Sequence, residues 1–289
     1  MRRLYIITAI CVFSAFSGTL KAQVVNSIIR DTDPAAAALG GASVANDANA
    51  FALDNNAASM SLSSLRMAAG ASYSLLQPSA VKMGVISASG YYRVAEKLAI
   101  GAGFKSLSYD SYPVTSSEGR STEEFAPKEI ALKLGASYLI TEGLSAGVNV
   151  KFASVSFAPT SVSKVICADL SAMYRAGALT AGINAANLGS QVMDIRAGAA
   201  YKLSVIKASA QAEFLSGAGL MGAVGAEYSF KDFAFVRTGV HLGSSSKAIP
   251  TFWSVGAGVK YLGIGADVSY YISSATVGNS VSAGISYSF

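Results

Sequence analysis

Apolar and polar side chains alternate along most of this chain, from Arg66 to its last residue. The segment 280–289 shows the pattern most clearly, because every second side chain is apolar: Val281, Ala283, Ile285, Tyr287 and Phe289. The residues between them are serine or glycine. A period of two residues is the pattern of a β-strand with one apolar and one polar face.

The same alternation predicts about fourteen antiparallel strands within 66–289. They lie at 66–75, 81–92, 98–104, 130–140, 144–152, 166–174, 179–186, 194–203, 205–214, 220–230, 233–242, 252–261, 264–272 and 280–289. No apolar run after residue 22 approaches the roughly 20 residues of a membrane-spanning helix. The chain is therefore predicted to be all-β. It is either a soluble β protein or a transmembrane antiparallel β-barrel, since only helices and closed barrels satisfy the backbone inside lipid.

The predicted connections alternate in length along the chain. Those after even-numbered strands are tight: 141–143, 176–177, 203–204, 231–232 and 262–263. Those after odd-numbered strands tend to be longer: 110–127, 158–164, 187–193 and 243–250. Short turns on one rim and long loops on the other are typical of outer-membrane barrels.

Tyrosines occur with the same regularity. Each even-numbered strand carries one near its end: Tyr91 or Tyr92, Tyr138, Tyr174, Tyr201, Tyr228, Tyr261 and Tyr287. They would form a ring at the short-turn rim, as aromatic side chains do at membrane interfaces. Both regularities favour the transmembrane barrel. The last strand, with Tyr287 and a terminal Phe289, resembles the assembly signal of bacterial outer-membrane barrels, which implies insertion by the barrel-assembly machinery into outer-membrane lipid.

Residues 1–65 differ from the barrel region. Two arginines, an apolar run at 4–16 and the sequence Leu-Lys-Ala at 20–22 predict a signal peptide at 1–22. Residues 23–65 show little alternation, and we expect a plug-like segment in or under the barrel, with a flexible leader as the alternative. Within it, Asp33, Pro34 and Gly40-Gly41 predict the N-cap, first residue and end of a short helix. A second helical turn is predicted at 47–53.

Composition supports a membrane protein without indicating a charged partner. The chain has 289 residues, 52% hydrophobic and 13% charged, and soluble proteins carry about twice that charge. Loss of the signal peptide would leave 19 basic residues against 17 acidic ones. No basic patch with interleaved aromatic residues is present, which argues against nucleic-acid binding. Cys167 would be the one cysteine of the mature chain, so no internal disulfide is expected.

Charged residues of the barrel region are expected to face the lumen, because a charge facing lipid at mid-depth costs roughly 2–4 kcal/mol. The candidate luminal charges are Lys133, Lys151, Asp169, Arg196, Glu213, Glu227, Arg237 and Asp267, and Lys105, Lys202, Lys207 and Lys260 have the same parity. We expect these charges to pair with one another, with water and with the plug, and a solute path is the alternative. The rest of the inward face is expected to be small and polar.

The sequence offers little chemistry for catalysis. His241 is the only histidine, and a histidine without a second His or a Cys beside it is a poor metal site. A barrel hydrolase would need Ser, His and an orienting Asn or Asp in one cluster. The Gly-x-Gly stretches lie inside strands, where glycine thins the wall. We predict no catalytic residue, no cofactor and no metal.

Four stretches match, in order, the motifs of one family. They are the segments 38–59, 168–189, 222–239 and 265–289. They resemble four motifs of the PorV/PorQ-like outer-membrane proteins. The first segment resembles that family's stretch with Gly-Gly, Asp-Ala and Asn-Pro-Ala, and the second resembles its Asp-Leu-x-x-x-Tyr strand. The third resembles its Gly-Ala-Glu-Tyr and Arg-x-Gly pair, and the fourth resembles its last hairpin. That family is itself similar to the FadL-type transporters. The proline of Asn-Pro-Ala is absent, since Asn55-Asn56-Ala57-Ala58 stands there.

The resemblance implies an integral protein of the bacterial outer membrane with periplasmic termini, and it leaves two functions open. One is a component of type IX secretion or surface-protein assembly that binds secreted or surface-anchored proteins. Its candidate contacts lie in the loop 110–127: Tyr112, Val114, Glu118, Arg120 and Phe125. The other is a FadL-like transporter of small hydrophobic molecules. An apolar path from the loops into the lumen would favour transport, and a filled lumen with exposed apolar loop residues would favour assembly.

Overall fold

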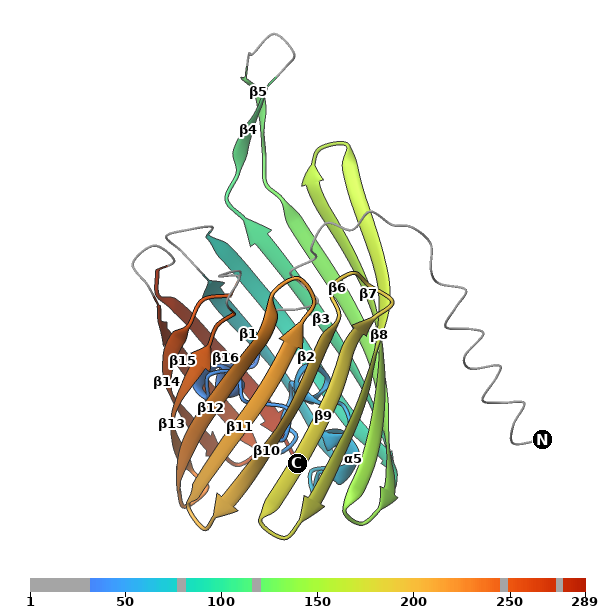
Figure 1. The fold of residues 1–289 in the computed structure, drawn as a ribbon, viewed down its shortest axis with the longest axis vertical. Coiled ribbons are helices and arrows are strands. Elements are labelled where there is room, and N and C mark those ends of the chain that lie inside the picture. Colours follow the sequence, from blue (N-terminus) through green and yellow to red (C-terminus); the bar gives the residue numbers. More distant parts are fainter. Residues whose placement is uncertain (1–31, 77–81, 116–120, 245–248, 274–277) are drawn as a thin grey trace, which may run out of the picture.

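The computed structural model describes residues 32–76, 82–115, 121–244, 249–273 and 278–289. Within these residues, fourteen antiparallel strands close a barrel, and β1 pairs with β16 (Figure 1). The barrel strands are β1 (Met67–Leu76), β2 (Met83–Ala95), β3 (Leu98–Tyr109), β6 (Lys128–Thr141), β7 (Leu144–Ala158), β8 (Ser161–Ala176), β9 (Leu179–Leu188), β10 (Asp194–Leu203), β11 (Ile206–Leu215), β12 (Gly219–Phe230), β13 (Ala234–Leu242), β14 (Phe252–Tyr261), β15 (Ile264–Ile272) and β16 (Ser280–Ser288). Closure leaves no strand edge exposed to lipid. The predicted fold class is confirmed.

The observed strands follow the predicted ones, and β10, β14 and β15 have the predicted bounds. The largest differences are at the loop ends of β3, β7 and β8, which extend five or six residues farther than predicted. In β7 the polarity reverses there, because Ser154 and Ser156 face outward while Val155 and Phe157 face inward. The strands continue beyond the apolar band, where an outward side chain no longer has to be apolar.

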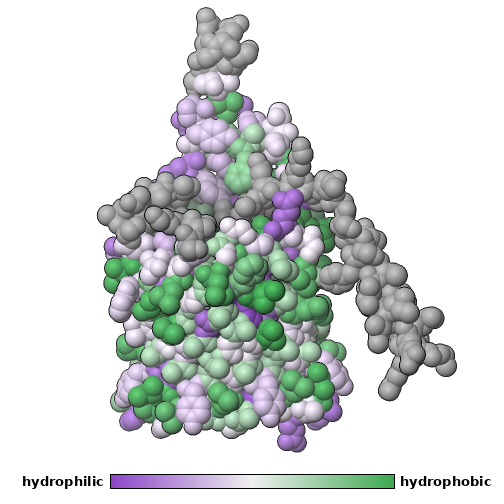
Figure 2. Space-filling model, in the orientation of Figure 1, coloured by the Kyte–Doolittle hydropathy of each residue, from purple (hydrophilic) through white to green (hydrophobic). Residues whose placement is uncertain are grey.

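The outer face of the barrel is apolar. Leu134, Val150 and Leu220 are 67%, 54% and 71% exposed. Figure 2 shows hydrophobic residues spread over the wall on this side, with hydrophilic residues more frequent at the short-turn rim and on the projecting hairpin. Such an exterior would be unstable in water and is the surface that a bilayer requires.

The tyrosine ring lies at the short-turn rim, on the outer face. Its exposed members are Tyr92, Tyr138, Tyr174, Tyr201, Tyr228, Tyr261 and Tyr287. Tyr91 belongs to the lumen instead, where its hydroxyl group donates to Ser63 Oγ at 2.8 Å. The alternative left open between Tyr91 and Tyr92 is therefore resolved in favour of Tyr92.

Two connections differ from the prediction. The segment 110–127 contains two short strands, β4 (Tyr112–Thr115) and β5 (Ser121–Phe125), which pair as a hairpin that projects beyond the rim (Figure 1). The expected long loop at 158–164 is a tight turn, since β7 ends at Ala158 and β8 begins at Ser161. Both segments lie outside the apolar band, where strands pair without the alternation that lipid imposes.

Residues 32–65 lie inside the barrel and form three short helices, α3 (Pro34–Ala38), α4 (Ala52–Asn55) and α5 (Ser59–Leu62) (Figure 1). We call these residues the plug. The helix α3 forms as predicted, because Oδ1 of the N-cap residue Asp33 accepts from Ala35 N at 2.9 Å. None of the described helices is long and apolar enough to cross a membrane. The predicted signal peptide lies outside the described residues.

The helical turn predicted at 47–53 is displaced. The side chain of Asn49 accepts from the backbone N of Phe51 at 2.9 Å, and such local hydrogen bonds compete with a helix. The helix α4 consequently begins only at Ala52.

Candidate functional site: the plugged lumen

Inward-facing glycines make room for the plug. Gly225 and Gly239 are cross-strand partners on β12 and β13, and Leu39 lies against both. A Cβ atom at Gly239 would lie 2.1 Å from the carbonyl carbon of Leu39, and one at Gly225 would lie 2.6 Å from its carbonyl oxygen. Any side chain at these two positions would therefore displace the plug backbone.

Side chains of the wall also form hydrogen bonds with backbone groups of the plug. Gln211 Oε1 accepts from the backbone N atoms of Ser43 and Val44 at 3.1 and 3.0 Å. Ser254 Oγ accepts from Gly40 N at 2.9 Å. Short helices and turns leave many backbone groups without internal partners, and a buried segment must find them elsewhere. The inner wall supplies these partners and so holds the plug in one place.

Asp54 of α4 is the charged centre of the contact between plug and wall. Lys105 Nζ lies 3.0 Å and Lys133 Nζ 2.5 Å from Asp54 Oδ1, and none of the three side chains is more than 12% exposed. Burial by itself raises the pKa of Asp54, but the two ammonium groups outweigh it and hold that pKa below its ordinary value. These three charges tie α4 to β3 and β6.

A second ion pair lies on the wall itself. Lys151 Nζ is 2.7 Å from Asp169 Oδ1, with side chains 5% and 2% exposed. Asn187 joins them, because its backbone N donates to Asp169 and its Oδ1 accepts from Lys151. Asn187 has φ +60° at the register shift between β8 and β9, and asparagine tolerates that conformation. Cys167 packs beside it, with Sγ 4.0 Å from Asn187 Oδ1.

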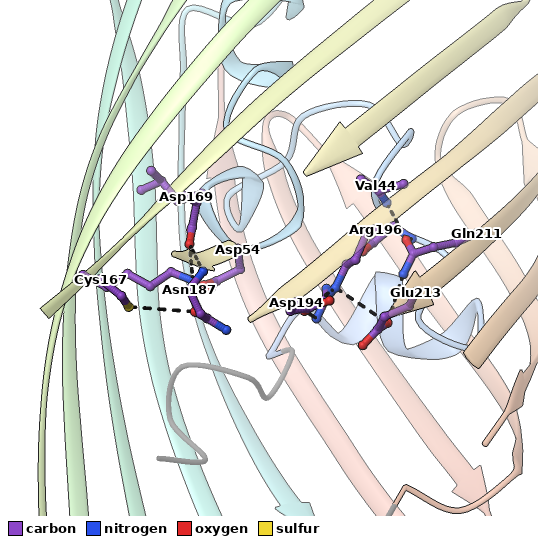
Figure 3. Close-up of polar contacts among 12 residues, drawn as sticks. Val44, Asp54, Cys167, Asp169, Asn187, Asp194, Arg196, Gln211 and Glu213 are labelled. Carbon is purple, nitrogen blue, oxygen red and sulfur yellow. Dashed lines mark hydrogen bonds and ion pairs between the residues drawn. The ribbon is translucent and has the colours of Figure 1, made fainter. Parts of the chain in front are cut away.

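The arginines of the wall are paired in the same way. Arg196 Nη2 lies 2.8 Å from Asp194 Oδ2, and Arg196 Nε lies 3.6 Å from Glu213 Oε2. Figure 3 shows this group and the Asp169–Asn187 group on the inner wall. The structure places every candidate luminal charge there, each in an ion pair: Lys133, Lys151, Asp169, Arg196, Glu213, Glu227, Arg237 and Asp267.

Towards the loops the inner wall becomes apolar. Three buried clusters line it, which we call the loop-side wall: Met83, Val85 and Leu107; Ala131, Ala153, Val155, Val165 and Cys167; and Val192, Leu215, Ala218 and Met221. Half-buried aromatic rings extend it on β14 and β15, where Phe252 stacks on His241 and meets Tyr271 edge to face. The expectation of a small, polar inward face is therefore wrong for this part of the lumen.

The predicted assembly signal lies at the short-turn rim. Tyr287 and Phe289 are 46% and 54% exposed on the outer face, and their ring centroids lie 5.9 Å apart. The backbone of Phe289 pairs with Met67 at the start of β1. The terminal aromatic residue thus lies at the seam where the last strand meets the first.

The candidate partner loop lies apart from the lumen. Tyr112 and Phe125 are cross-strand partners in the hairpin with ring centroids 5.8 Å apart. Tyr112 is 40% exposed, and Val114 is partly buried. Glu118 and Arg120 lie outside the described residues. The structure therefore does not bring the hairpin residues together with the luminal charges.

Sequence reasoning missed Asp54 and the loop-side wall. Asp54 lies in a segment without periodicity, so nothing along the chain pairs it with the lysines of β3 and β6. The sequence did contain one sign of the loop-side wall, because Ile86 interrupts the alternation of apolar and polar residues in β2. Met83 and Val85 face the lumen while Ile86 is 55% exposed on the outside, so both faces of the strand are apolar. Among the described residues, no group of His, Cys, Asp or Glu is placed to hold a metal ion.

These features agree with solved barrels of the FadL type. The toluene transporter TbuX of Ralstonia pickettii matches with a TM-score of 0.67 and 14% identity, over 88% of this chain and 97% of that one. The monoaromatic hydrocarbon channel CymD gives 0.63 and 14%, over 92% and 98%. A FadL homologue of Pseudomonas aeruginosa gives 0.59 and 12%, over 90% and 98%. No family model and no curated protein matches the sequence.

The chain is accordingly an integral membrane β-barrel of the outer-membrane type, with a FadL-like fold. At 12–14% identity the likeness concerns the fold alone. The finer resemblance to PorV/PorQ-like proteins finds no support in these comparisons. The structures named above are described as transporters, channels or their homologues, and none as an enzyme.

Asp33 is expected to matter for the internal order of the plug. Its Oδ2 accepts from Asn49 Nδ2 at 2.6 Å and from Asn55 Nδ2 at 2.7 Å, so it joins three parts of the plug. Asp33→Ala removes these bonds and the cap of α3, which costs about 1–3 kcal/mol. Hydrogen exchange should become faster throughout residues 34–55. The control Asp47→Ala breaks an exposed ion pair worth about 0–1 kcal/mol. An equal effect of both substitutions would contradict the role given to Asp33.

Proposed function

We propose that this protein is an outer-membrane channel that takes up small hydrophobic molecules from the loop side. The observation that carries the proposal is the loop-side wall. Porins that pass water and polar solutes have polar interiors, whereas the loop-side wall consists of apolar side chains such as Leu107, Val155 and Met221. These side chains are buried in the structure, so an apolar molecule would contact them by taking the place of the groups that cover them, and would leave water in doing so. The FadL-like fold supports the proposal, because two of the matching structures are described as transporters or channels for toluene or monoaromatic hydrocarbons.

The position of the plug makes the two ends of the lumen different. It occupies the lumen between the loop-side wall and the short turns, and glycines, hydrogen bonds and ion pairs hold it there. A molecule that enters from the loops therefore meets the apolar wall first and the plug second. Short turns face the periplasm in outer-membrane barrels, so this proposal places the carboxyl terminus and the plugged end on the periplasmic side.

A binding experiment with matched variants tests the proposal. The full-length protein in non-ionic detergent is titrated with the apolar dye N-phenyl-1-naphthylamine. Leu107→Asn combined with Val155→Asn makes the loop-side wall polar and is expected to weaken binding about tenfold, since 1.4 kcal/mol corresponds to a factor of ten. The control Val162→Asn changes an outward side chain that is 59% exposed on the same β7–β8 hairpin. Absence of dye binding to the wild type would refute the proposal.

A second candidate function rests on the hairpin. Tyr112 is exposed and the hairpin projects beyond the rim, as a contact for secreted or surface-anchored proteins would require. The plugged lumen and the exposed Tyr112 meet the condition stated above for an assembly role, but the comparisons give no support to type IX secretion. If the hairpin binds a partner, Tyr112→Ser should remove proteins that co-purify with the barrel from outer membranes and leave dye binding unchanged. An unchanged set of co-purifying proteins, or none in the wild type, counts against this function.

A further inference from the structure

A cavity of about 380 Å³ lies at the short-turn end of the lumen, between the plug and the wall. The plug contributes Ala45 and Asp47, and residues of the turns after β8 and β10 line the outer end, which is partly open. The strand register places the wall side chains of the cavity on one inward face: Arg175, Thr180, Ala200, Lys202 and Lys207. The cavity is therefore luminal and lies on the opposite side of the plug from the loop-side wall.

The lining of this cavity is strongly basic. Lys202 and Lys207 are directly opposite each other on β10 and β11, and like charges in that position destabilise a sheet. Lys207 Nζ lies 3.2 Å from Glu227 Oε1, whereas the described part of the chain gives Lys202 no ion pair. Among the described residues, three cationic side chains and one carboxylate line the cavity. Glu227 offsets the charge of Lys207, and the remaining excess of positive charge attracts an anion.

The one carboxylate in the lining is held loosely. Asp47 Oδ1 lies 2.6 Å from Arg175 Nη2, but the two side chains are 60% and 31% exposed. An exposed ion pair contributes little stability, so another oxyanion can take the place of Asp47 beside Arg175.

We propose that this cavity binds a small organic anion, with its carboxylate or phosphate group held between Arg175, Lys202 and Lys207. Arg175 Nη1 donates to Leu62 O at 3.3 Å and Nη2 donates to Asp47 Oδ1 at 2.6 Å, so displacement of Asp47 makes Nη2 available to the anion. The lysines offer point charges, and a guanidinium group with lysines suits an oxyanion. The volume lies in the range of small-molecule sites. The anion would relieve the repulsion between Lys202 and Lys207 and would compete with Asp47. This site goes beyond hydrophobic transport, because it shares no residue with the loop-side wall.

Calorimetric titration of the full-length protein with phenyl phosphate and with benzoate tests the site. The protein is kept in a phosphate-free, non-ionic detergent at constant ionic strength. Lys202→Gln is expected to weaken binding about fivefold, and Asp47→Asn is expected to tighten it about threefold, because the competing carboxylate is gone. Lys260→Gln is the control, since Lys260 has the same inward parity on β14 but does not line the cavity, and its affinity should equal that of the wild type.

Three outcomes would overturn the proposal: no saturable binding to the wild type, equal losses in Lys202→Gln and Lys260→Gln, or unchanged affinity in Asp47→Asn. Misfolding is excluded by thermal unfolding, which Lys202→Gln should leave unchanged or shift upward because it relieves a like-charge pair.

Lipid discs that contain phosphatidylglycerol identify the source of the anion. Displacement of phenyl phosphate by that lipid assigns the site to a headgroup, and retention assigns it to a soluble anion. Binding of the neutral dye should be the same in all these variants, which separates this site from the proposed function.

Discussion

Gly239→Ala is expected to unseat the plug and make the barrel conduct ions. A Cβ atom at Gly239 would lie 2.1 Å from the carbonyl carbon of Leu39 and 2.3 Å from Gly40 N. Both neighbours are backbone atoms, which cannot turn aside as a flexible side chain can. Overpacking of this kind costs roughly 1–3 kcal/mol, and here the plug can relieve it only by moving. Planar-bilayer recordings should therefore show steady conductance for Gly239→Ala and a closed wild type.

The matched control is Gly103→Ala. Gly103 also faces inward, on β3, but a Cβ atom there would approach no atom more closely than 3.5 Å. This variant is expected to remain closed. A closed Gly239→Ala barrel, or equal conductance in the two variants, would show that the glycines do not position the plug.

Asp54→Asn is expected to release α4 from the wall. The substitution leaves the ammonium groups of Lys105 and Lys133 buried without the carboxylate that lies between them. Removal of one partner from a buried ion pair costs about 3–5 kcal/mol. Hydrogen exchange followed by mass spectrometry should show faster exchange in residues 52–55, with residues 34–38 much less affected. Unchanged exchange in α4 would contradict the anchoring role of Asp54.

The same ion cluster predicts a pH dependence. The folded-state pKa of Asp54 is lowered from its ordinary value near 3.8, so its contribution to plug seating is complete above that value and is lost as the pH falls through the folded-state pKa. The difference in exchange between the wild type and Asp54→Asn should accordingly be constant from pH 8 to about pH 5 and shrink below about pH 4. A difference that already shrinks between pH 8 and pH 6 would mean that another group controls the plug.

The barrel was predictable because lipid imposes one requirement on every strand. Each outward side chain within the bilayer must be apolar, and the alternation that results is visible without any partner. The tight turns also marked the ends of strands. In the turn between β14 and β15, Leu262 and Gly263 both have positive φ, as a two-residue hairpin requires. The bounds of β14 and β15 were predicted correctly for this reason. The predicted end of β7 at Phe152 was too early, because the alternation of apolar and polar side chains reverses beyond that residue.

The contacts of the plug were not predictable from the chain. Leu39 and Gly239 are far apart in sequence, and the reason for a glycine on β13 becomes visible only when the plug backbone lies against it. The same holds for Asp54, whose two lysine partners were expected on the inward face but had no assigned carboxylate. The loop-side wall was missed because Met83 and Val85 lie beside the lipid-facing Ile86, and two apolar faces on one strand remove the alternation.

The most direct test of the central claim compares the uptake of an apolar and a polar molecule of similar size. Cells that express the protein and cells that do not are supplied with labelled toluene or labelled erythritol at the same concentration. A plugged barrel with an apolar loop-side wall predicts that expression raises the initial uptake of toluene several-fold and leaves that of erythritol unchanged. Equal increases for both molecules would indicate an open polar pore, and no increase for toluene would contradict hydrophobic transport.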